Sequence, residues 1–332
     1  MKQSRARRGG RLVLVAALAV VLAACTMSGG RTDMETEDGS GGGAGDNSGY
    51  TIAMITHETP GDTFWDKIKA GATQAAQNYG IDLKYSNDPV AANQATLIQN
   101  AVDSKVDGIA TTLATPDALQ AAVGDANDAK IPVVAFNSGI DQYKDVGASM
   151  YFGSDEQLAG ETAGARIDED GGKHTLCVIQ AAGSVALEAR CAGVKSKSPN
   201  TENIQVEGKD DSAVVSSLQA KLSQDKSIDY VVTLGAPIAQ DALKARADAG
   251  SKAKIVTFDL SPDAAQAIKD GDIEFSIDQQ PYVQGYQAVT ALYLNLKNGN
   301  DIGGGGPVLT GPSFVDQENI DVVLPFAQKG TR

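Results

Sequence analysis

The sequence is poor in the residues from which metal centres and many nucleophilic sites are built. It contains two histidines, His57 and His174, and three cysteines, Cys25, Cys177 and Cys191. A zinc site or a Cys–His nucleophile pair needs a cluster of such residues, and the sequence shows none. We therefore expect no metal site, no resident cofactor and no catalytic centre of these kinds.

Motifs for nucleotides, nucleic acids and acyl transfer are also missing. No Gly-x-Gly-x-x-Gly follows the first expected strand, and the sequence has neither a Walker loop nor a Gly-x-Ser-x-Gly elbow. The net charge is −14, and no basic patch remains once the N-terminal segment is removed. The charge argues against nucleic acid as a partner, and the missing motifs give little support to a dinucleotide, ATP or nucleophile-elbow role.

Long hydrophobic runs are absent except near the N-terminus. After a basic start, residues 12–24 form an apolar run of 13 residues, which is too short for a transmembrane helix. The run ends in Leu-Ala-Ala-Cys, which resembles a bacterial lipobox. We expect residues 1–25 to be a lipoprotein signal peptide with Cys25 as the lipidated residue. The alternative is an ordinary secretory signal with a chance cysteine. Residues 26–49 are rich in Gly, Ser, Asp and Glu, which predicts a flexible tether.

Residues 106–137 have the pattern of a strand, a helix and a second strand. Two apolar runs flank a segment with apolar residues at helical spacing, which Pro116 can open. The pattern returns at 228–259, with Pro237 in the place of Pro116. Such units imply parallel strands, and the long separation predicts two similar α/β lobes rather than a solenoid.

A polar residue follows the second strand of each repeat: Asn137 in the first copy and Asp259 in the second. Open α/β sheets bind ligands outside the carboxyl ends of their strands. We therefore expect both side chains to face a shared cleft, one from each lobe. The alternative is a helix cap or a turn, which Asn and Asp also favour.

Four further positions are candidates for contact with a ligand. Phe64 and Trp65 are adjacent on an expected helix, so both cannot face the core, and one ring could stack on a sugar. His57 lies in the loop before this helix. Arg190 is either a surface charge or a donor aimed into the cleft.

Cys177 and Cys191 lie in the expected first strand of the second lobe and in the helix after it. An exported protein can form disulfides, and assigning Cys25 to the lipid leaves an even pair. We hypothesise a Cys177–Cys191 bridge, worth roughly 3 kcal/mol on the chain-entropy model. Two buried free cysteines are the alternative.

Five stretches carry a resemblance to a known family: IAMITHETPGDTFWDKIKAGA at 52–72, TPDAL with IPVVAFN at 115–137, FGSDEQLAGETAG at 152–164, TFD at 257–259, and SIDQQPYVQGYQAV at 276–289. With the lipobox and the two lobes, they resemble ABC-transporter sugar-binding lipoproteins of the ribose/galactose type, in the periplasmic binding protein-like I family.

The resemblance covers essentially the whole chain from residue 50 to residue 324. It implies two similar doubly wound parallel-sheet lobes joined by a three-strand hinge. The N-terminal lobe would comprise 50–153 and 281–303, and the C-terminal lobe 154–280 and 304–326.

The resemblance also implies ligand contacts. The family's aromatic pair falls on Phe64 and Trp65, the residue ending its fourth strand on Asn137, its Gly-Phe-Asp carboxylate on Asp259, and its hinge glutamine on Gln279.

Departures from the ribose binders change the expected ligand. Those proteins have Asp-Arg where this chain has Asn137-Ser138, and an arginine where it has Glu188. The resemblance therefore implies a monosaccharide or related polyol rather than ribose itself. It also implies a monomer outside the cytoplasm, anchored by lipid to the outer face of the cell membrane, that delivers its solute to an ABC permease.

Two alternatives remain at this point. One is an autoinducer-2-like or sugar sensor that partners a membrane receptor. The other is a sugar hydrolase pairing Asp259 with Glu58 or Glu188, although no motif supports that pairing.

Overall fold

A computed structural model describes residues 48–59 and 61–332. The predicted signal peptide, Cys25 and nearly all of the predicted tether lie outside the described residues. Within the described ranges, no helix combines the length and the apolar character that crossing a membrane requires.

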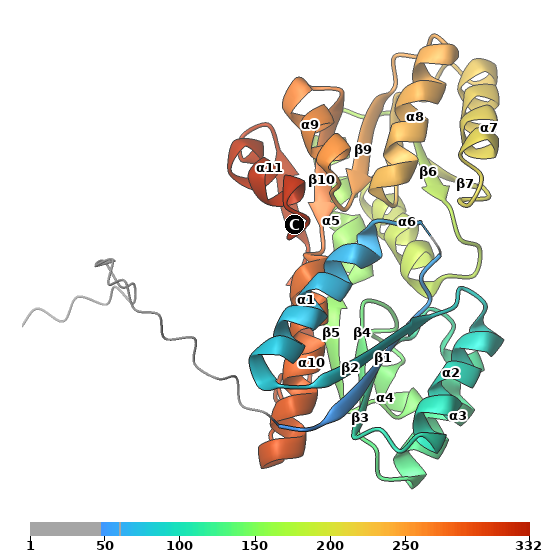
Figure 1. Ribbon diagram of the computed structural model, residues 1–332. Coiled ribbons are helices and arrows are strands. Elements are labelled where there is room, and N and C mark those ends of the chain that lie inside the picture. Colours follow the sequence, from blue (N-terminus) through green and yellow to red (C-terminus); the bar gives the residue numbers. More distant parts are fainter. Residues whose placement is uncertain (1–47, 60) are drawn as a thin grey trace, which may run out of the picture. The chain divides into compact units, whose positions relative to one another are not determined.

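The first sheet has six strands in the order β11-β5-β4-β3-β1-β2, and all of its pairings are parallel. Figure 1 labels β1 to β5 of this sheet. Its strands and the helices that accompany them are β1 (Thr51–Thr56), α1 (Phe64–Tyr79), β2 (Asp82–Asn87), α2 (Ala91–Asp103), β3 (Gly108–Thr112), α3 (Pro116–Asp128), β4 (Val133–Phe136), α4 (Tyr143–Val146), β5 (Met150–Ser154), α10 (Pro281–Asn298) and β11 (Val308–Gly311).

The second sheet has the matching order β12-β10-β9-β8-β6-β7, and only β12 runs antiparallel to its neighbour. Its elements are α5 (Glu156–Glu169), β6 (Thr175–Ile179), α6 (Val185–Lys197), β7 (Thr201–Gln205), α7 (Asp211–Gln224), β8 (Tyr230–Thr233), α8 (Ala236–Asp248), β9 (Lys254–Phe258), α9 (Pro262–Asp270), β10 (Ile273–Asp278), β12 (Ser313–Asp316) and α11 (Ile320–Gln328). The prediction of two similar doubly wound lobes is confirmed.

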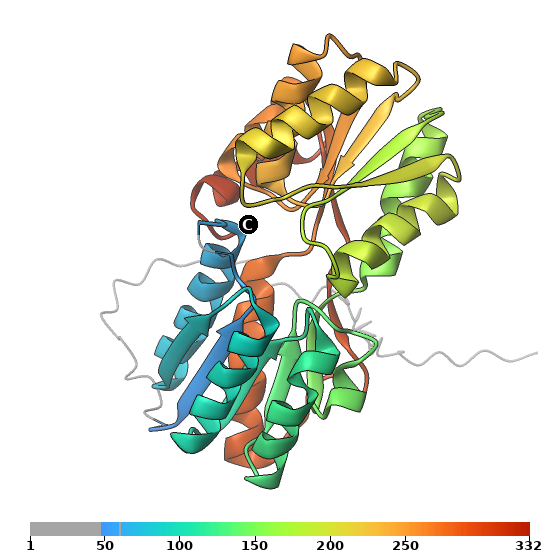
Figure 2. The same cartoon turned by 90° about the vertical axis from the view of Figure 1, so that its right-hand side faces the viewer.

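Each sheet is covered by helices on both faces, which explains its nearly continuous apolar strands (Figure 2). In β1, Ile52 and Met54 belong to the core shared with α1 and α10, whereas Ala53 and Ile55 belong to the core shared with α2 and α3. Because both faces of the sheet are apolar cores, polar side chains are expected at the ends of the strands.

The chain passes between the two sheets three times. β5 leads into α5 at Asp155, β10 leads into α10 through Gln279 and Gln280, and β11 leads into β12 through Pro312. Three connecting segments therefore form the hinge.

The lobe boundary expected between residues 303 and 304, within the glycine run 303–306, is wrong, because residues 304–311 belong to the first lobe. The glycines form a turn in which the Gly306 N–H donates to the Gly303 carbonyl at 3.0 Å. The β-forming run after the turn pairs with β5, with Val308 opposite Phe152, before the chain crosses. The glycine run thus reverses the chain within one lobe and does not link the two.

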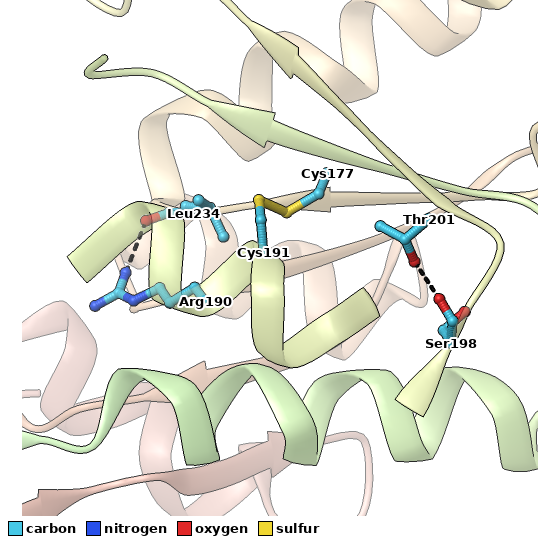
Figure 3. Close-up of a disulfide and its surroundings, with 6 residues drawn as sticks. All are labelled: Cys177, Arg190, Cys191, Ser198, Thr201 and Leu234. Atoms are coloured by element: carbon cyan, nitrogen blue, oxygen red, sulfur yellow. Dashed lines mark hydrogen bonds between the residues drawn. A yellow bond between two sulfur atoms is a disulfide. The ribbon is translucent and has the colours of Figure 1, made fainter. Parts of the chain in front are cut away.

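The predicted disulfide is confirmed: Cys177 in β6 is bonded to Cys191 in α6, and both residues are fully buried (Figure 3). The bond ties the helix to the strand beneath it. Both ends lie in one lobe, so the disulfide does not restrict the hinge.

We expect neither Cys177 nor Cys191 to be a free thiol in the oxidised protein. In a chain with Cys25→Ser, thiol titration after unfolding should find none without reductant and two after reduction. Two reactive thiols in the unreduced protein would contradict the structure. The Cys177→Ser/Cys191→Ser variant should give none under either condition.

Glycines allow two helix pairs to pack with their backbones nearly in contact. A Cβ added at Gly71 of α1 would lie 2.0 Å from the Tyr282 carbonyl oxygen of α10, and one added at Gly285 of α10 would lie 2.0 Å from the Ile68 oxygen of α1. In the second lobe, a Cβ at Gly160 of α5 would lie 2.1 Å from the Arg190 oxygen of α6. The close contact in the second lobe places Arg190 beside the start of α5.

We expect Gly160→Ala to destabilise the protein by about 2 kcal/mol, because α5 and α6 would have to separate. The measurement is the free energy of unfolding in urea. Gly124→Ala in α3 is the matched control, since a Cβ there meets nothing within 4 Å. It should be neutral or stabilising by about 0.5–1 kcal/mol. Equal effects of the two substitutions would contradict the packing argument.

Candidate functional site

Asn137 and Asp259 occupy equivalent positions in the two lobes. Asn137 follows β4 with φ of 66°, and Asp259 follows β9 with φ of 64°. Asn and Asp tolerate this left-handed conformation better than other non-glycine residues. Each backbone N–H donates to the next strand: Asn137 to Phe152 O at 2.9 Å and Asp259 to Ile277 O at 3.0 Å.

Neither side chain caps the helix that follows. The residue before α4 is Gln142, and the residue before α9 is Ser261, whose side chain accepts from Ala264 N. The alternative that Asn137 and Asp259 serve as helix caps is therefore wrong. Both residues are only 7% exposed, so their side chains need polar partners inside the protein.

Gln279 in the second crossing joins these two residues. Its Oε1 accepts from Asn137 Nδ2 at 3.1 Å, and its Nε2 donates to Asp259 Oδ1 at 2.8 Å. Gln284 of α10 completes the group, because its Oε1 accepts from Asn137 Nδ2 at 3.2 Å and its Nε2 donates to Gln279 Oε1 at 2.9 Å. A continuous hydrogen-bonded chain thus connects the two strand ends through the hinge.

These internal bonds determine what the group can offer to a ligand. Both hydrogens of Asn137 Nδ2 are used, so its Oδ1 remains as an acceptor. Asp259 Oδ1 accepts from Gln279, while Oδ2 has no hydrogen bond from the described part of the chain. The group therefore presents mainly acceptors, which suit the O–H donors of a polyhydroxylated molecule.

Arg190 is an internal cation and not a surface charge. It is 3% exposed, and its Nε donates to Glu156 Oε2 at 2.5 Å. Its Nη1 donates to the Leu234 carbonyl at 3.0 Å (Figure 3) and lies 3.8 Å from Asp259 Oδ2. Its guanidinium also lies 4.7 Å from the centre of the Phe258 ring. Arg190 thus supports Asp259 from inside the second lobe.

Burial dominates the electrostatics of this region. It raises the pKa of Asp259 to about 7, although Arg190 and the hydrogen bond from Gln279 oppose the change. Burial also raises the pKa of Glu156, again opposed by Arg190. Asp259 is therefore close to half-ionised near neutral pH.

A second charged group at the hinge was not predicted from the sequence. Asp278, at the end of β10, is fully buried and accepts from Arg332 Nε at 2.6 Å. Lys67 of α1 is 3% exposed, and burial lowers its pKa while Asp259 and Asp278 oppose that effect. A buried lysine on the face of α1 that packs inward has no signal in apolar spacing alone.

The aromatic pair divides as its adjacency requires. Trp65 is 5% exposed and belongs to the first lobe's core, whereas Phe64 is half-buried. The Trp65 ring meets the rings of both Phe64 and His57 edge-on, at centroid distances of 5.1 and 4.8 Å. Phe64 is thus the member of the pair that keeps accessible surface.

His57 directly follows β1, at the same sheet edge as Asn137. Its Nδ1 lies 2.8 Å from Thr112 Oγ1 at the end of β3. Burial lowers the pKa of His57 to about 4, so the ring is neutral at physiological pH.

Among the described residues, one group could hold a metal ion: His174, Glu202 and Asp225, whose ligand atoms lie within 4.8 Å of one another. His174 precedes β6, at the opposite end of the strands from Asp259. Lys221 Nζ lies 2.8 Å from Glu202 Oε1, so that carboxylate already has a cationic partner. We assign this group no role.

A family model described as a periplasmic binding protein domain matches residues 52–301. Among solved structures, a carbohydrate transporter from Acidothermus cellulolyticus in complex with myo-inositol is 55% identical. The match covers 85% of this chain and 99% of that one, with a TM-score of 0.84.

Two curated proteins are more distant relatives. The xylose/arabinose-binding protein of Sulfolobus acidocaldarius is 26% identical over 301 residues, which cover 83% of this chain and 73% of that protein. The ribose import binding protein of Salmonella typhimurium is 29% identical over 257 residues, covering 74% and 85%.

Proposed function

The chain belongs to the periplasmic binding protein domain family, and from this premise we propose that it is the extracytoplasmic solute-binding protein of an ABC importer. Its solute would be a monosaccharide or a related polyol. The relatives compared above are named as sugar-binding proteins or as a carbohydrate transporter, which supports a binding role.

Myo-inositol is our first candidate for the solute. The 55% identical carbohydrate transporter was solved with this cyclic polyol. Myo-inositol carries a hydroxyl on every ring carbon, and each hydroxyl can both donate and accept a hydrogen bond. The free acceptors on Asn137 and Asp259 suit such a molecule better than an anionic solute, because a second buried negative charge beside Asp259 would be repelled.

The observation that carries this proposal is the hydrogen-bonded chain Asn137–Gln279–Asp259. It brings an acceptor from each lobe to the hinge, so a solute bound to both would favour the arrangement in which the lobes close over it. In this proposal Phe64 covers one face of the ring, while Arg190 holds Asp259 in place.

The cellular setting is also part of the proposal. Residues 1–25 would direct export, Cys25 would carry the lipid, and residues 26–49 would tether a monomeric binding domain to the outer face of the cell membrane. The partner would be an ABC permease, with no role for nucleic acid. A sensor that partners a membrane receptor is the less favoured alternative, because the curated ribose relative is named as an import protein.

A binding screen tests the proposed function. Purified protein is heated with myo-inositol, other cyclitols, pentoses, hexoses, acyclic polyols, amino acids and autoinducer-2, and hits are measured by calorimetry. A ligand that binds only the folded state raises the melting temperature by mass action. We expect a shift with myo-inositol or another polyol. Shifts only with amino acids or with autoinducer-2 would overturn the assignment of the solute.

A further inference from the structure

The hydroxyl of Thr112 has an unusually well-defined set of neighbours. Its Oγ1 lies 3.1 Å from the backbone N of His57 and 3.2 Å from Nε2 of Gln94, and both groups can only donate. Gln94 Nε2 also donates to the Thr112 carbonyl at 2.8 Å, which fixes the orientation of the amide. The oxygen of the Thr112 hydroxyl therefore acts as an acceptor in both contacts.

The remaining neighbour is the His57 ring, whose Nδ1 lies 2.8 Å from Thr112 Oγ1. Within the described ranges, this nitrogen is the one acceptor that can take the Thr112 hydroxyl proton. A nitrogen that accepts carries no proton of its own, so the proton of the neutral ring must be on Nε2.

We propose that Thr112 fixes His57 as the Nε2–H tautomer, and that this Nε2–H donates a hydrogen bond to a hydroxyl oxygen of the bound solute. The inference rests on the proposed function and deepens it. Thr112 is a positioning residue in this scheme, and His57 is the group that contacts the solute.

The position of His57 supports this role. The residue directly follows β1, at the sheet edge that also carries Asn137, and it is half-buried, whereas the strand before it is mostly buried. The edge contact with Trp65 at 4.8 Å orients the ring from the side of α1. Within the described ranges, the His57 ring forms a hydrogen bond through Nδ1 and none through Nε2, so this donor is available.

The site otherwise offers mainly acceptors, so a donor at His57 Nε2 would complement it. Asn137 donates both amide hydrogens to Gln279 and Gln284, and Arg190 donates to Glu156 and to the Leu234 carbonyl. These hydrogen bonds are internal to the protein. The acceptors left at Asn137 and Asp259 bind the O–H side of solute hydroxyls, and the solute oxygens then require donors. A neutral imidazole N–H supplies one without adding a buried charge.

Long-range proton–nitrogen NMR of the purified protein tests the tautomer of His57 directly. The protein has only two histidines, so the His174→Gln variant assigns both ring systems. We expect His57 to show a protonated Nε2 and an unprotonated Nδ1 near neutral pH. A protonated Nδ1 in the unmodified protein would overturn the inference. Thr112→Val should give a mixture of tautomers, and Thr112→Ser should keep the original one.

Binding of myo-inositol tests the donor role. A glutamine amide can place an N–H near the position of Nε2, whereas the shorter asparagine cannot reach it. We therefore expect His57→Asn to lose about tenfold in affinity and His57→Gln to lose much less. Equal affinities of His57→Asn and the unmodified protein would overturn the donor role. Both variants avoid the buried Thr112, so a folding defect at that residue cannot obscure the result.

The two levels of failure are distinguishable. A protein that binds no polyol or sugar in the screen refutes the proposed function and, with it, the donor role of His57. The NMR spectrum is recorded without solute, so it supports or refutes the tautomer in either case.

Discussion

Arg190→Met is expected to destabilise the protein by about 3–5 kcal/mol. The substitution keeps most of the side-chain volume but leaves the buried carboxylates of Glu156 and Asp259 without their nearest cation. The measurement is the free energy of unfolding at pH 7. The loss should be smaller at pH 5, because an acid whose folded pKa is raised costs stability as the pH rises from its unfolded pKa to its folded pKa.

Two controls separate this effect from a general loss of charge. Arg246→Met removes an ion pair with Asp272 whose side chains are 25% and 62% exposed, and it should cost under about 1 kcal/mol. Adding Glu156→Gln to Arg190→Met should restore part of the stability, since it removes one uncompensated buried carboxylate. A double variant no more stable than Arg190→Met alone would show that the charge of Glu156 is not the cause.

Asp259→Ala is expected to weaken solute binding by at least about 2 kcal/mol, or roughly thirtyfold. The substitution removes a charged acceptor from a buried site. It also leaves Gln279 Nε2 without its 2.8 Å partner. Calorimetry with myo-inositol, or with the best solute from the screen, measures the loss. Unchanged affinity would remove Asp259 from the site.

The raised pKa of Asp259 adds a pH dependence to this prediction. Hydroxyl donors stabilise the ionised carboxylate, so binding should release a proton and affinity should fall as the pH drops below about 7. With a pKa of about 7 in the free protein, the affinity at pH 6 should be about tenfold lower than at pH 8. Asp259→Asn should bind weakly at both values.

Solute affinity should rise with pH, whereas the stability of the solute-free protein should fall. The folded pKa of Asp259 lies above the unfolded value of 3.8, so its contribution to stability declines as the pH rises from about 4 to about 7. Asp259→Asn should therefore be more stable than the unmodified protein at pH 8 when no solute is present. The control is Asp263→Asn, an exposed position at the start of α9, which should change neither profile. A flat affinity profile in the unmodified protein would contradict the role of ionised Asp259.

Most of the architecture follows from local patterns in the sequence. The repeated strand–helix–strand pattern, with Pro116 and Pro237 opening equivalent helices, is sufficient to predict two lobes. The same repeat predicts that Asn137 and Asp259 occupy equivalent strand ends, because each residue directly follows the second strand of its copy. Gln279 came from the resemblance alone, since a glutamine in a short connection has no pattern of its own.

What the sequence did not predict depends on tertiary packing. Gln284 and Lys67 are polar residues on helix faces that turn out to be buried, because α1 and α10 pack against each other at the hinge. Thr112 resembles any residue at the end of a strand until His57 and Gln94 are placed around it. The error at 303–306 arose because glycine permits a tight turn as readily as a flexible link.

The discontinuity of the first lobe has a consequence for the order of folding. Its core includes Ala288, Val289 and Leu292 of α10, and its edge strand β11 is made last, whereas β6 to β10 of the second lobe form one uninterrupted segment. A chain leaving the ribosome can therefore assemble most of its second lobe before its first lobe is complete. Until residues 281–311 have been synthesised, the N-terminal half lacks α10, one of the two helices that cover one face of its sheet. The first lobe, which lies nearest in sequence to the segment predicted to direct export, is therefore the part of the chain that stays incompletely folded for longest.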